Sequence, residues 1–404
     1  MWLAWAHPEH YPDKALRKYP AKTVVMQQFI QRFLARFIPG DGAAIGPPCS
    51  GLSGVSGAKP ARPYPVSDHF DGQRFHTPWP TEDRKFSDLL RWKFTSRSTP
   101  WPVHVPNIRQ DVPPERVHGD ELRLTYIGHS TTLIQTAGVN VLTDPVWSER
   151  TGPFLIGLKR ARKPGLSLDM LPPIDAVLVS HNHYDHLDLP TLAALWKRHR
   201  PRIVAPLGNA ALIDGALGRR VCEELDWWES LDVFPGAGAS ASCQAGSDAH
   251  SRSEHPVGLR VHAAPAHHWS ARGVFDRRKA LWCSFVLEAP GGHIGFFGDT
   301  GYGSGEAFRL IRSRFGSMRV ALLPIGAYEP RWFMSPAHMN PEEAVLAMRD
   351  LGARRAVATH HGVFKLTDEG IDTPLYHLAN ARCEYGVSSE AFRVMDVGEG
   401  WQAP

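Results

Sequence analysis

Three histidines and one aspartate crowd into six positions of the stretch VLVSHNHYDHLDLP, residues 177–190. His181 and His183 are two residues apart, so an extended chain places both imidazoles on one side. Asp185 and His186 follow, beyond a bend, and can face a second ion. Imidazoles and carboxylates are ligands that zinc binds in catalytic sites. Because these four side chains directly follow an apolar run, the stretch predicts a metal site rather than a set of surface histidines.

The same arrangement recurs at four other places, where an apolar run ends in a side chain of the metal-binding type. These runs are RVHAAPAHHW with His268, IGFFGDTGYG with Asp299, RAVATHH with His360 and VNVLTDP with Asp144. Strand ends gathered at one edge of a sheet would bring such groups into one pocket. Two zinc ions need about seven ligands when one carboxylate bridges them and open positions hold water. The sequence therefore predicts a binuclear centre.

The composition excludes several classes of protein. With 43% hydrophobic and 21% charged residues, the chain of 404 residues can bury a large core, which we expect to be one domain with an extension. The net charge of +4 comes without a block of Lys and Arg, so nucleic-acid binding is not indicated. The five cysteines are widely spaced and form no C-x-x-C pair, which favours a reducing, cytoplasmic compartment over a disulfide framework. Neither a signal peptide nor an apolar run of about 18 residues is found, so we expect a protein that is neither secreted nor integral to a membrane.

The N-terminal extension, residues 1–66, contains an amphipathic helix predicted for residues 25–38, with apolar side chains at helical spacing. Such a helix either packs on the protein's own core or lies at a membrane surface, and the sequence leaves both open. Residues 39–67 are rich in Gly, Pro and Ser, which predicts a flexible linker before a folded domain at 67–404. A second stretch of this kind, residues 235–256, predicts a disordered insertion within that domain.

Short β-type runs alternate with helical patterns over the rest of the chain. The runs are LRLTYIG, TTLIQTAG, VNVLTDP, IDAVLVS, RIVAP, GLRVHAAPA, CSFVLEA, HIGFFGD, VALLPIG and RAVATH. Helical patterns cover residues 190–198, 306–315 and 341–351. The last begins with Asn340 as N-cap and Pro341 at the first helical position. The early strands follow one another as hairpins and the later ones alternate with helices, which predicts an α/β fold of two layered sheets covered by helices.

The His-x-His-x-Asp-His motif, the PAHHW histidine, the GDTGY aspartate and the late HHG histidine together resemble the metallo-β-lactamase superfamily of binuclear hydrolases. Longer segments resemble one branch of it, the N-acylphosphatidylethanolamine-hydrolysing phospholipases D: GHSTTLIQ, LTDPVWSER, SHNHYDHLD, LPIGAYEPRWFM, HMNPEEAV and HHGVFKL. The resemblance extends from about Ser67 to about Leu366 and leaves out residues 235–256. It implies an αββα sandwich with a binuclear metal site at one edge of the sheets.

The resemblance divides the metal ligands into two sets and one bridge. It implies that one zinc ion is bound by His181, His183 and His268, the other by Asp185, His186 and His360, and that both are bridged by Asp299. The family register selects His268 and His360 from two pairs of adjacent histidines. Packing, or support of a neighbouring ligand, is therefore expected for His267 and His361.

Four further residues are expected around the metal ions. Tyr184 and His338 match family positions that contact the substrate phosphate. His338 is expected to be catalytic together with Asp185, which would orient the attacking hydroxide. His129 and Asp144 lie at strand ends beyond a filled ligand set, so we expect them to support the ligands, for example by fixing the tautomer of an imidazole.

The resemblance implies hydrolysis of an N-acylphosphatidylethanolamine-like phospholipid by a hydroxide held between two zinc ions, with phosphatidic acid and an N-acylethanolamine as products. A phospholipid partner implies peripheral contact with a membrane. Apolar surface for it is offered by residues 25–38 or by FSDLLRWKF at 86–94, although such segments are more often core. Two alternatives remain: a lactonase or other metal-dependent hydrolase of the same superfamily, and a catalytically silent, membrane-associated metal-binding protein. The motifs AYEPRWF and HMNPEEAV favour the phospholipase, and the full ligand set favours catalysis.

Overall fold

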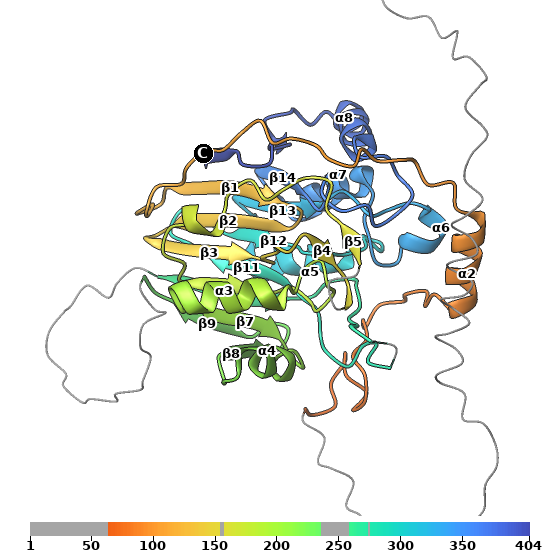
Figure 1. Cartoon of the computed structure of the whole chain (residues 1–404), viewed down its shortest axis with the longest axis horizontal. Helices are drawn as coiled ribbons and strands as arrows, with labels where there is room; N and C mark the ends of the chain where they lie inside the picture. Colours follow the sequence, from red (N-terminus) through yellow and green to blue (C-terminus); the bar gives the residue numbers. More distant parts are fainter. Residues whose placement is uncertain (1–63, 154–156, 236–257, 274) are drawn as a thin grey trace, which may run out of the picture. The chain divides into compact units, whose positions relative to one another are not determined.

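The computed structural model describes residues 64–153, 157–235, 258–273 and 275–404 (Figure 1). The helix predicted at 25–38 and, except for Pro235, the insertion predicted at 235–256 lie outside these residues and stay predictions. Most of the predicted linker also lies outside them.

The last residues of that predicted linker are packed against the domain. The Tyr64 hydroxyl donates a hydrogen bond to Glu224 at 2.8 Å and accepts one from the backbone N–H of Gly208 at 2.9 Å. The Tyr64 ring lies edge-on to Phe70, with the ring centroids 6.1 Å apart. The prediction of a flexible linker is therefore wrong for residues 64–67, because this aromatic side chain anchors the segment.

Two seven-stranded sheets form the domain. In spatial order the first sheet contains β16 (Gly400–Ala403), β1 (Leu122–Gly128), β2 (Thr131–Thr136), β3 (Val139–Thr143), β6 (Ala176–Leu178), β7 (Arg202–Pro206) and β8 (Cys222–Leu225). The second contains β15 (Phe392–Arg393), β14 (Arg355–Thr359), β13 (Val320–Pro324), β12 (Ile294–Phe296), β11 (Ser284–Glu288), β10 (Leu259–Ala264) and β9 (Ser230–Val233). A small separate sheet pairs β4 (Arg150–Thr151) with β5 (Leu158–Lys159).

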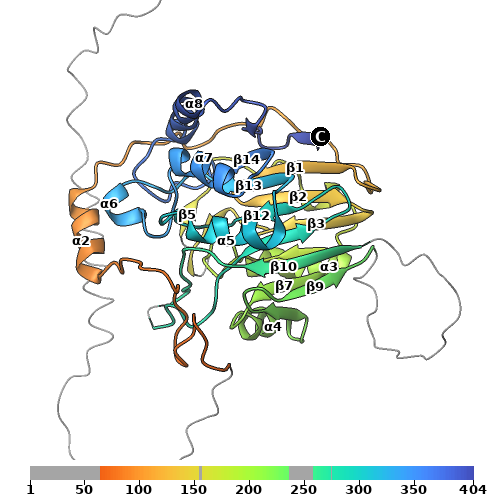
Figure 2. The same cartoon turned by 180° about the vertical axis from the view of Figure 1, so that it is seen from behind.

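Helices cover the outer faces of both sheets. The helices are α2 (Phe86–Thr95), α3 (Leu189–His199), α4 (Ala210–Leu217), α5 (Glu306–Phe315), α6 (Arg331–Met334), α7 (Pro341–Asp350), α8 (Thr373–Tyr385) and the short 3₁₀ helix η2 (Leu168–Met170). Helices α3 and α4 pack on the first sheet (Figure 1), and α5, α7 and α8 pack on the second (Figure 2). Helices α2 and α6 lie to the side of the sandwich and contact each other (Figure 1). The three helices predicted from the sequence are confirmed as α3, α5 and α7.

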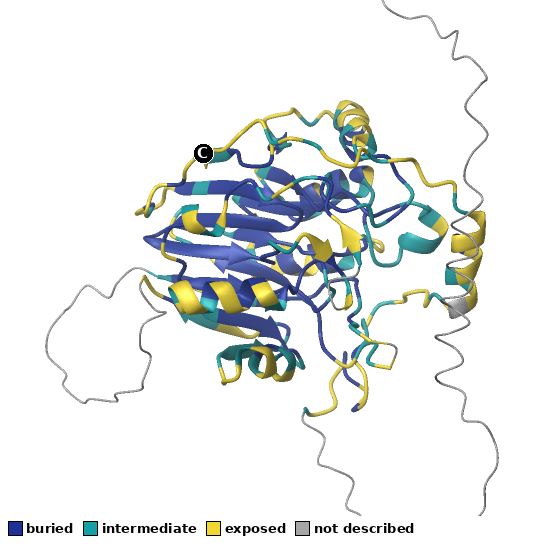
Figure 3. Ribbon diagram, in the orientation of Figure 1, coloured by how far each residue is buried: buried dark blue, intermediate teal, exposed yellow. Residues whose placement is uncertain are grey.

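The core between the sheets explains the apolar runs. In β13, Val320 and Leu322 face the other sheet, whereas Ala321 and Leu323 face the helices. Side chains alternate along a strand, so a strand that is covered on both sides needs apolar residues at every position. Figure 3 shows the strands of the sheets buried beneath partly exposed helices. The predicted αββα sandwich is confirmed.

The start of α7 shows how local sequence positions a residue of the predicted site. The Asn340 side chain accepts a hydrogen bond from the backbone N–H of Glu343 at 2.8 Å, and the Glu343 carboxylate accepts one from the backbone N–H of Asn340 at 2.9 Å. This reciprocal capping satisfies two amide groups that the helix cannot pair itself. Arg331 of α6 binds the same carboxylate at 2.7 Å and donates to the carbonyl of His338 at 2.9 Å. The backbone of His338 is thereby fixed between α6 and α7.

Candidate metal centre

Six strands with a common direction end at the same edge of the sandwich. In the first sheet β1 is antiparallel to β2 and β2 to β3, while β6 is parallel to β3, so β1, β3 and β6 run the same way. In the second sheet the same reasoning, taken through β11 and β13, places β10, β12 and β14 in one direction. The side chains that follow these strands are His129, Asp144, His181, His268, Asp299 and His360. The sequence pattern of a donor after each strand thus becomes one cluster in space.

Three of these residues have a backbone conformation that is uncommon for side chains other than glycine. His129, Asp144 and His360 have φ angles of 59°, 32° and 58°. A left-handed backbone conformation turns the chain sharply at the end of a strand. Because it costs free energy, it occurs mainly where the surrounding structure enforces it. The backbone N–H of His360 donates to the carbonyl of His129 at 2.8 Å, which joins the two sheets at this turn. The strain therefore lies in the residues that bring side chains into the cluster.

The first donor group consists of His181, His183, His268 and Asp299, whose nitrogen and oxygen atoms lie within 4.8 Å of one another. His183 Nδ1 is 2.9 Å from His181 Nε2 and 3.2 Å from His268 Nε2. Asp299 Oδ2 is 3.9 Å from His181 Nε2 and 3.8 Å from His268 Nε2. The four donors thus surround one small space.

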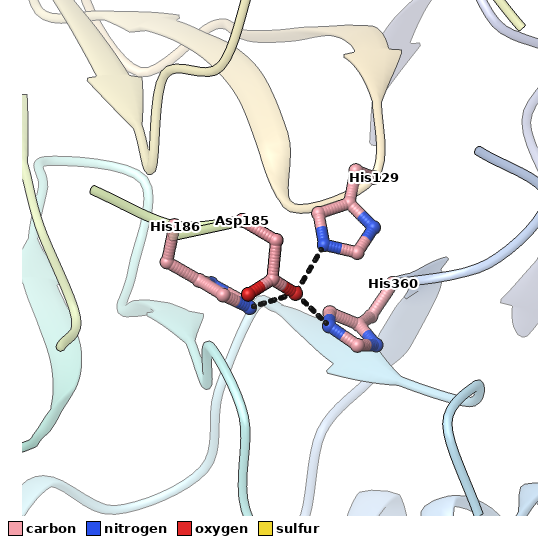
Figure 4. A group of neighbouring side chains, drawn as sticks. All are labelled: His129, Asp185, His186 and His360. Atoms are coloured by element: carbon pink, nitrogen blue, oxygen red, sulfur yellow. Dashed lines mark hydrogen bonds and ion pairs between the residues drawn. The ribbon is translucent and has the colours of Figure 1, made fainter. Parts of the chain in front are cut away.

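The second donor group consists of His129, Asp185, His186 and His360. Figure 4 shows the three imidazoles converging on one oxygen of Asp185. Asp185 Oδ2 is 3.0 Å from His129 Nε2 and 3.5 Å from Nε2 of both His186 and His360. Asp299 also reaches this group, since its Oδ1 is 3.0 Å from His360 Nε2 and its Oδ2 is 3.1 Å from His186 Nε2. Asp299 therefore lies between the two groups.

The spacing of the donors fits metal ions. A tetrahedral zinc ion with bonds of about 2.0 to 2.1 Å places neighbouring donor atoms roughly 3.4 Å apart, and the separations in both groups lie around that value. Nε2 of His186 and His360 and Oδ1 of Asp299 are buried and, despite their short separations, form no well-aligned hydrogen bond. Buried polar atoms are almost always satisfied, so these three atoms indicate ligands. Two buried His and Asp clusters thus form a candidate binuclear metal site.

Burial and charge set the protonation of the cluster. Burial lowers the pKa of His129 to about 3 and that of His268 to about 4, so both imidazoles are neutral and keep a lone pair. Burial opposes ionisation of Asp185 and Asp299, but the positive charge of His186 holds the pKa of both carboxyls well below the usual range. Buried charges are paired or coordinate metals. Two ionised carboxylates among these imidazoles are therefore suited to cations.

The residues behind the donors orient them. Asp144 Oδ2 is 2.6 Å from His186 Nδ1 and accepts a hydrogen bond from the Ser180 hydroxyl at 2.6 Å. A proton on Nδ1 of His186 leaves Nε2 free to face the centre, which is the tautomer a metal ligand needs. Ser180 Oγ also lies 2.9 Å from His181 Nδ1. The sequence analysis did not single out Ser180, although its position directly before His181 was a usable signal.

His129, which the sequence analysis expected to support a ligand, makes the shortest contact with Asp185 and also belongs to the second donor group. The side chains of His267 and His361 lie outside both groups. His267 stacks on Trp79, with ring centroids 4.9 Å apart, and His361 stacks on Tyr126 at 5.8 Å.

A cleft of about 540 Å³ opens onto the donors. Asp185, Asp299, His183, Tyr184 and His338 line its inner end. Its apolar wall comes from distant parts of the chain: Leu89 and Trp92 of α2, Leu158 of β5, Trp269, Phe333 and Met334 of α6, and Leu366. Arg84, Lys85 and Arg277 add positive charge. Of this wall only α2 was considered in the sequence analysis, because no local pattern marks α6 or β5 as its neighbours.

The two residues expected to contact the substrate differ in whether their polar atoms already form hydrogen bonds. His338 Nδ1 is buried without a hydrogen-bond partner and lies 3.9 Å from Asp299 Oδ2. The Tyr184 hydroxyl donates to the backbone carbonyl of Arg272 at 3.0 Å. In this conformation His338 is therefore available to a ligand, whereas the Tyr184 proton is engaged.

Comparison with known proteins agrees with the fold and the site. The model of the β-lactamase superfamily domain matches residues 139–361. An uncharacterized protein of Mycobacterium tuberculosis is 33% identical over 360 residues, which cover 86% of this chain and 87% of that protein. The N-acyl-phosphatidylethanolamine-hydrolyzing phospholipase D 1 of Caenorhabditis elegans is 33% identical over 290 residues, which cover 69% of this chain and 75% of that protein. The solved isothiocyanate hydrolase from Delia radicum gut bacteria is 19% identical, with a TM-score of 0.50 over 70% of this chain and 100% of that one, and so shares the fold.

The site is that of a metal-dependent hydrolase. The chain belongs to the metallo-β-lactamase superfamily, within the branch that includes the N-acylphosphatidylethanolamine-hydrolysing phospholipases D. The resemblance seen in the motifs is thereby confirmed. Within the described residues, none of the helices has both the length and the apolar character to cross a bilayer.

We expect Asp144→Asn to weaken metal binding about 10- to 100-fold, because an amide lacks the charge that holds the Nδ1 proton on His186. Metal content after competition with a chelator measures the effect. Asp232→Asn is the control, since Asp232 forms a partly exposed ion pair with Arg260 on β10. Equal metal retention in Asp144→Asn and the wild type would contradict this role of Asp144.

Proposed function

We propose that this protein is a zinc-dependent phosphodiesterase of the phospholipase D type, which hydrolyses N-acylphosphatidylethanolamine-like phospholipids to phosphatidic acid and an N-acylethanolamine. The observation that carries the proposal is the cleft, because its apolar wall leads directly to the two donor groups. A relative that is 33% identical is named for this activity. Imidazole and carboxylate donors without a thiolate suit zinc.

In the proposed centre His181, His183 and His268 would hold one zinc ion, Asp185, His186 and His360 would hold the other, and Asp299 would be shared between them. Zinc ions at such a site lower the pKa of water to about 7 and neutralise charge on phosphoryl oxygens. His129 fixes the carboxylate of Asp185 through their 3.0 Å contact. Asp185 is thereby oriented to accept a hydrogen bond from the attacking water.

The remaining residues of the cleft act on the substrate. In the proposed reaction a water oxygen bonds to phosphorus, and the bond from phosphorus to the ethanolamine oxygen breaks. The proton that the water loses is balanced by the proton that this ethanolamine oxygen gains. His338 is placed to donate a hydrogen bond to a phosphoryl oxygen, because its Nδ1 is free and lies at the inner end of the cleft. Tyr184 forms the neighbouring wall. Leu89, Trp92, Phe333 and Met334 offer apolar contact to acyl chains.

A substrate panel tests the proposed function. N-acylphosphatidylethanolamine, an acyl-homoserine lactone and a β-lactam are compared in the presence of zinc, and the products are identified by mass spectrometry. We expect hydrolysis of the phospholipid, with ¹⁸O from labelled water in the phosphatidic acid and none in the N-acylethanolamine. Turnover of the lactone without the phospholipid would favour a lactonase, and two bound zinc ions without any turnover would favour a catalytically silent protein.

We expect Asp299→Asn to lower the rate of phospholipid hydrolysis about 100-fold or more, since the amide cannot bind two cations as a carboxylate does. Initial rates with saturating zinc measure this loss. Asp169→Asn serves as the control, because Asp169 lies at the surface in an ion pair with Arg198. A wild-type rate in Asp299→Asn would refute its assignment as the bridge.

We further propose that this protein is cytoplasmic and that it contacts its phospholipid substrate at the membrane surface through α2. Phe94, at the end of α2, is 85% exposed, and Leu90, one turn earlier, is 41% exposed. Lys93 and Arg91 lie on the same helix, and exposed apolar side chains beside cations favour an anionic bilayer. The same helix supplies Leu89 and Trp92 to the cleft.

Phe94→Ser is expected to weaken binding to vesicles that contain anionic phospholipid by about 3-fold or more, because it removes one large apolar anchor. Co-sedimentation with vesicles measures the binding. Val103→Ser is the control, since Val103 is also 85% exposed but lies outside α2. The same loss in both variants, or in neither, would exclude α2 as the membrane contact.

A further inference from the structure

Arg272 lies four residues beyond His268 and is half-buried beside the loop that carries most of the metal donors. Its Nη1 donates to the carbonyl of Asn182 at 3.1 Å and to that of Leu187 at 2.8 Å. Its guanidinium also lies over the Tyr184 ring, 3.8 Å from the centroid. One side chain thus contacts both ends and the middle of residues 182–187.

The loop has few contacts of its own. Within residues 182–187 the backbone N–H groups of His186 and Leu187 donate to the carbonyl of His183 at 3.1 and 2.8 Å, which forms a single turn. The carbonyls of Asn182 and Leu187, on either side of that turn, accept from Arg272. Arg272 thus joins the two ends of the loop through its backbone, while His129 and Asp144 hold the side chains of Asp185 and His186.

Arg272 is itself held from the other side. The Asp276 carboxylate accepts hydrogen bonds from the backbone N–H of Arg272 at 3.1 Å and from that of Gly273 at 2.8 Å. The Tyr184 hydroxyl, in return, donates to the carbonyl of Arg272. The two segments are thus joined by hydrogen bonds in both directions, and neither Arg272 nor Tyr184 can shift alone.

We infer that Arg272 is a positioning residue for the metal centre, which clamps residues 182–187 so that His183 points to the first donor group while Asp185 and His186 point to the second. An arginine suits this task because its planar guanidinium donates to two carbonyls and stacks on an aromatic ring at the same time. A lysine ammonium can donate to both carbonyls, as the single Nη1 of Arg272 does, but it lacks the planar guanidinium that stacks on the Tyr184 ring at the same time. The sequence gives no sign of the role, since 85 residues separate Arg272 from Leu187.

The inference rests on the proposed metal centre and is tested without substrate. Purified wild type, Arg272→Met and Arg272→Lys are loaded with zinc and titrated with a chelator, and the zinc that remains bound is measured. We expect retention about 10-fold or more weaker in Arg272→Met, as for other residues that orient ligands, and an intermediate value in Arg272→Lys. Arg314→Met is the matched control, because Arg314 stacks on Trp228 at 5.1 Å without touching the centre.

A second measurement separates positioning from general stability. With zinc in excess, the thermal midpoint of Arg272→Met is expected to stay close to that of the wild type. Its KM for the phospholipid is expected to exceed that of the wild type, because Tyr184, which lines the cleft, has lost its contact with the Arg272 guanidinium. If Arg272→Met fails to fold, Arg272→Lys carries the test, since it keeps charge and length. Zinc retention equal to that of the wild type in the folded variants, or an equal loss in Arg314→Met, would overturn the inference. Wild type that binds no zinc would instead overturn the proposed function, and failure to hydrolyse a phospholipid would leave the role of Arg272 standing.

Discussion

The central constraint in this molecule is the burial of two ionised carboxylates. Asp185 and Asp299 are 8% and 4% exposed, and both are surrounded by imidazoles rather than by Lys or Arg. A buried charge is costly unless other groups compensate it, and imidazoles do so when they carry a proton, as at His186, or when they bind a shared cation. The sandwich supplies this arrangement by ending six strands at one edge. The left-handed turns at His129, Asp144 and His360 are the local cost of directing side chains inward there.

The parts of the structure that follow from local pattern could be predicted from the sequence. Strands such as VALLP are covered on both faces and so read as continuous apolar runs, and the capping residues of α7 mark its start. The donors could be found for the same reason, because each follows directly after a strand. A resemblance between motifs then separated His268 from His267, a choice that spacing alone left open.

The parts that depend on contacts between distant segments could not be predicted in this way. The cleft wall combines α2, β5 and α6, and its existence depends on how Trp92 packs on Phe333, with ring centroids 5.0 Å apart. Composition alone extends the predicted linker to residue 67. It does not reveal that Tyr64 is an anchor, because the partners of Tyr64, Gly208 and Glu224, are about 140 to 160 positions away. Arg272 is a third case. Its inferred role depends on hydrogen bonds to two backbone carbonyls, and a backbone carbonyl leaves no signal in the sequence.

The pairing of β9 with β10 has a consequence for how this chain tolerates change. Val233 pairs with Leu259 at the start of β10, and β10 runs from there toward the edge that carries His268. The two attachment points of residues 236–257 therefore lie at the far end of the sheet from the chemistry. We therefore expect gain or loss of sequence at this connection to leave the donor geometry unchanged, and the same holds for an epitope or fluorescent reporter inserted between Pro235 and Leu259, because the length of β10 separates it from the donors.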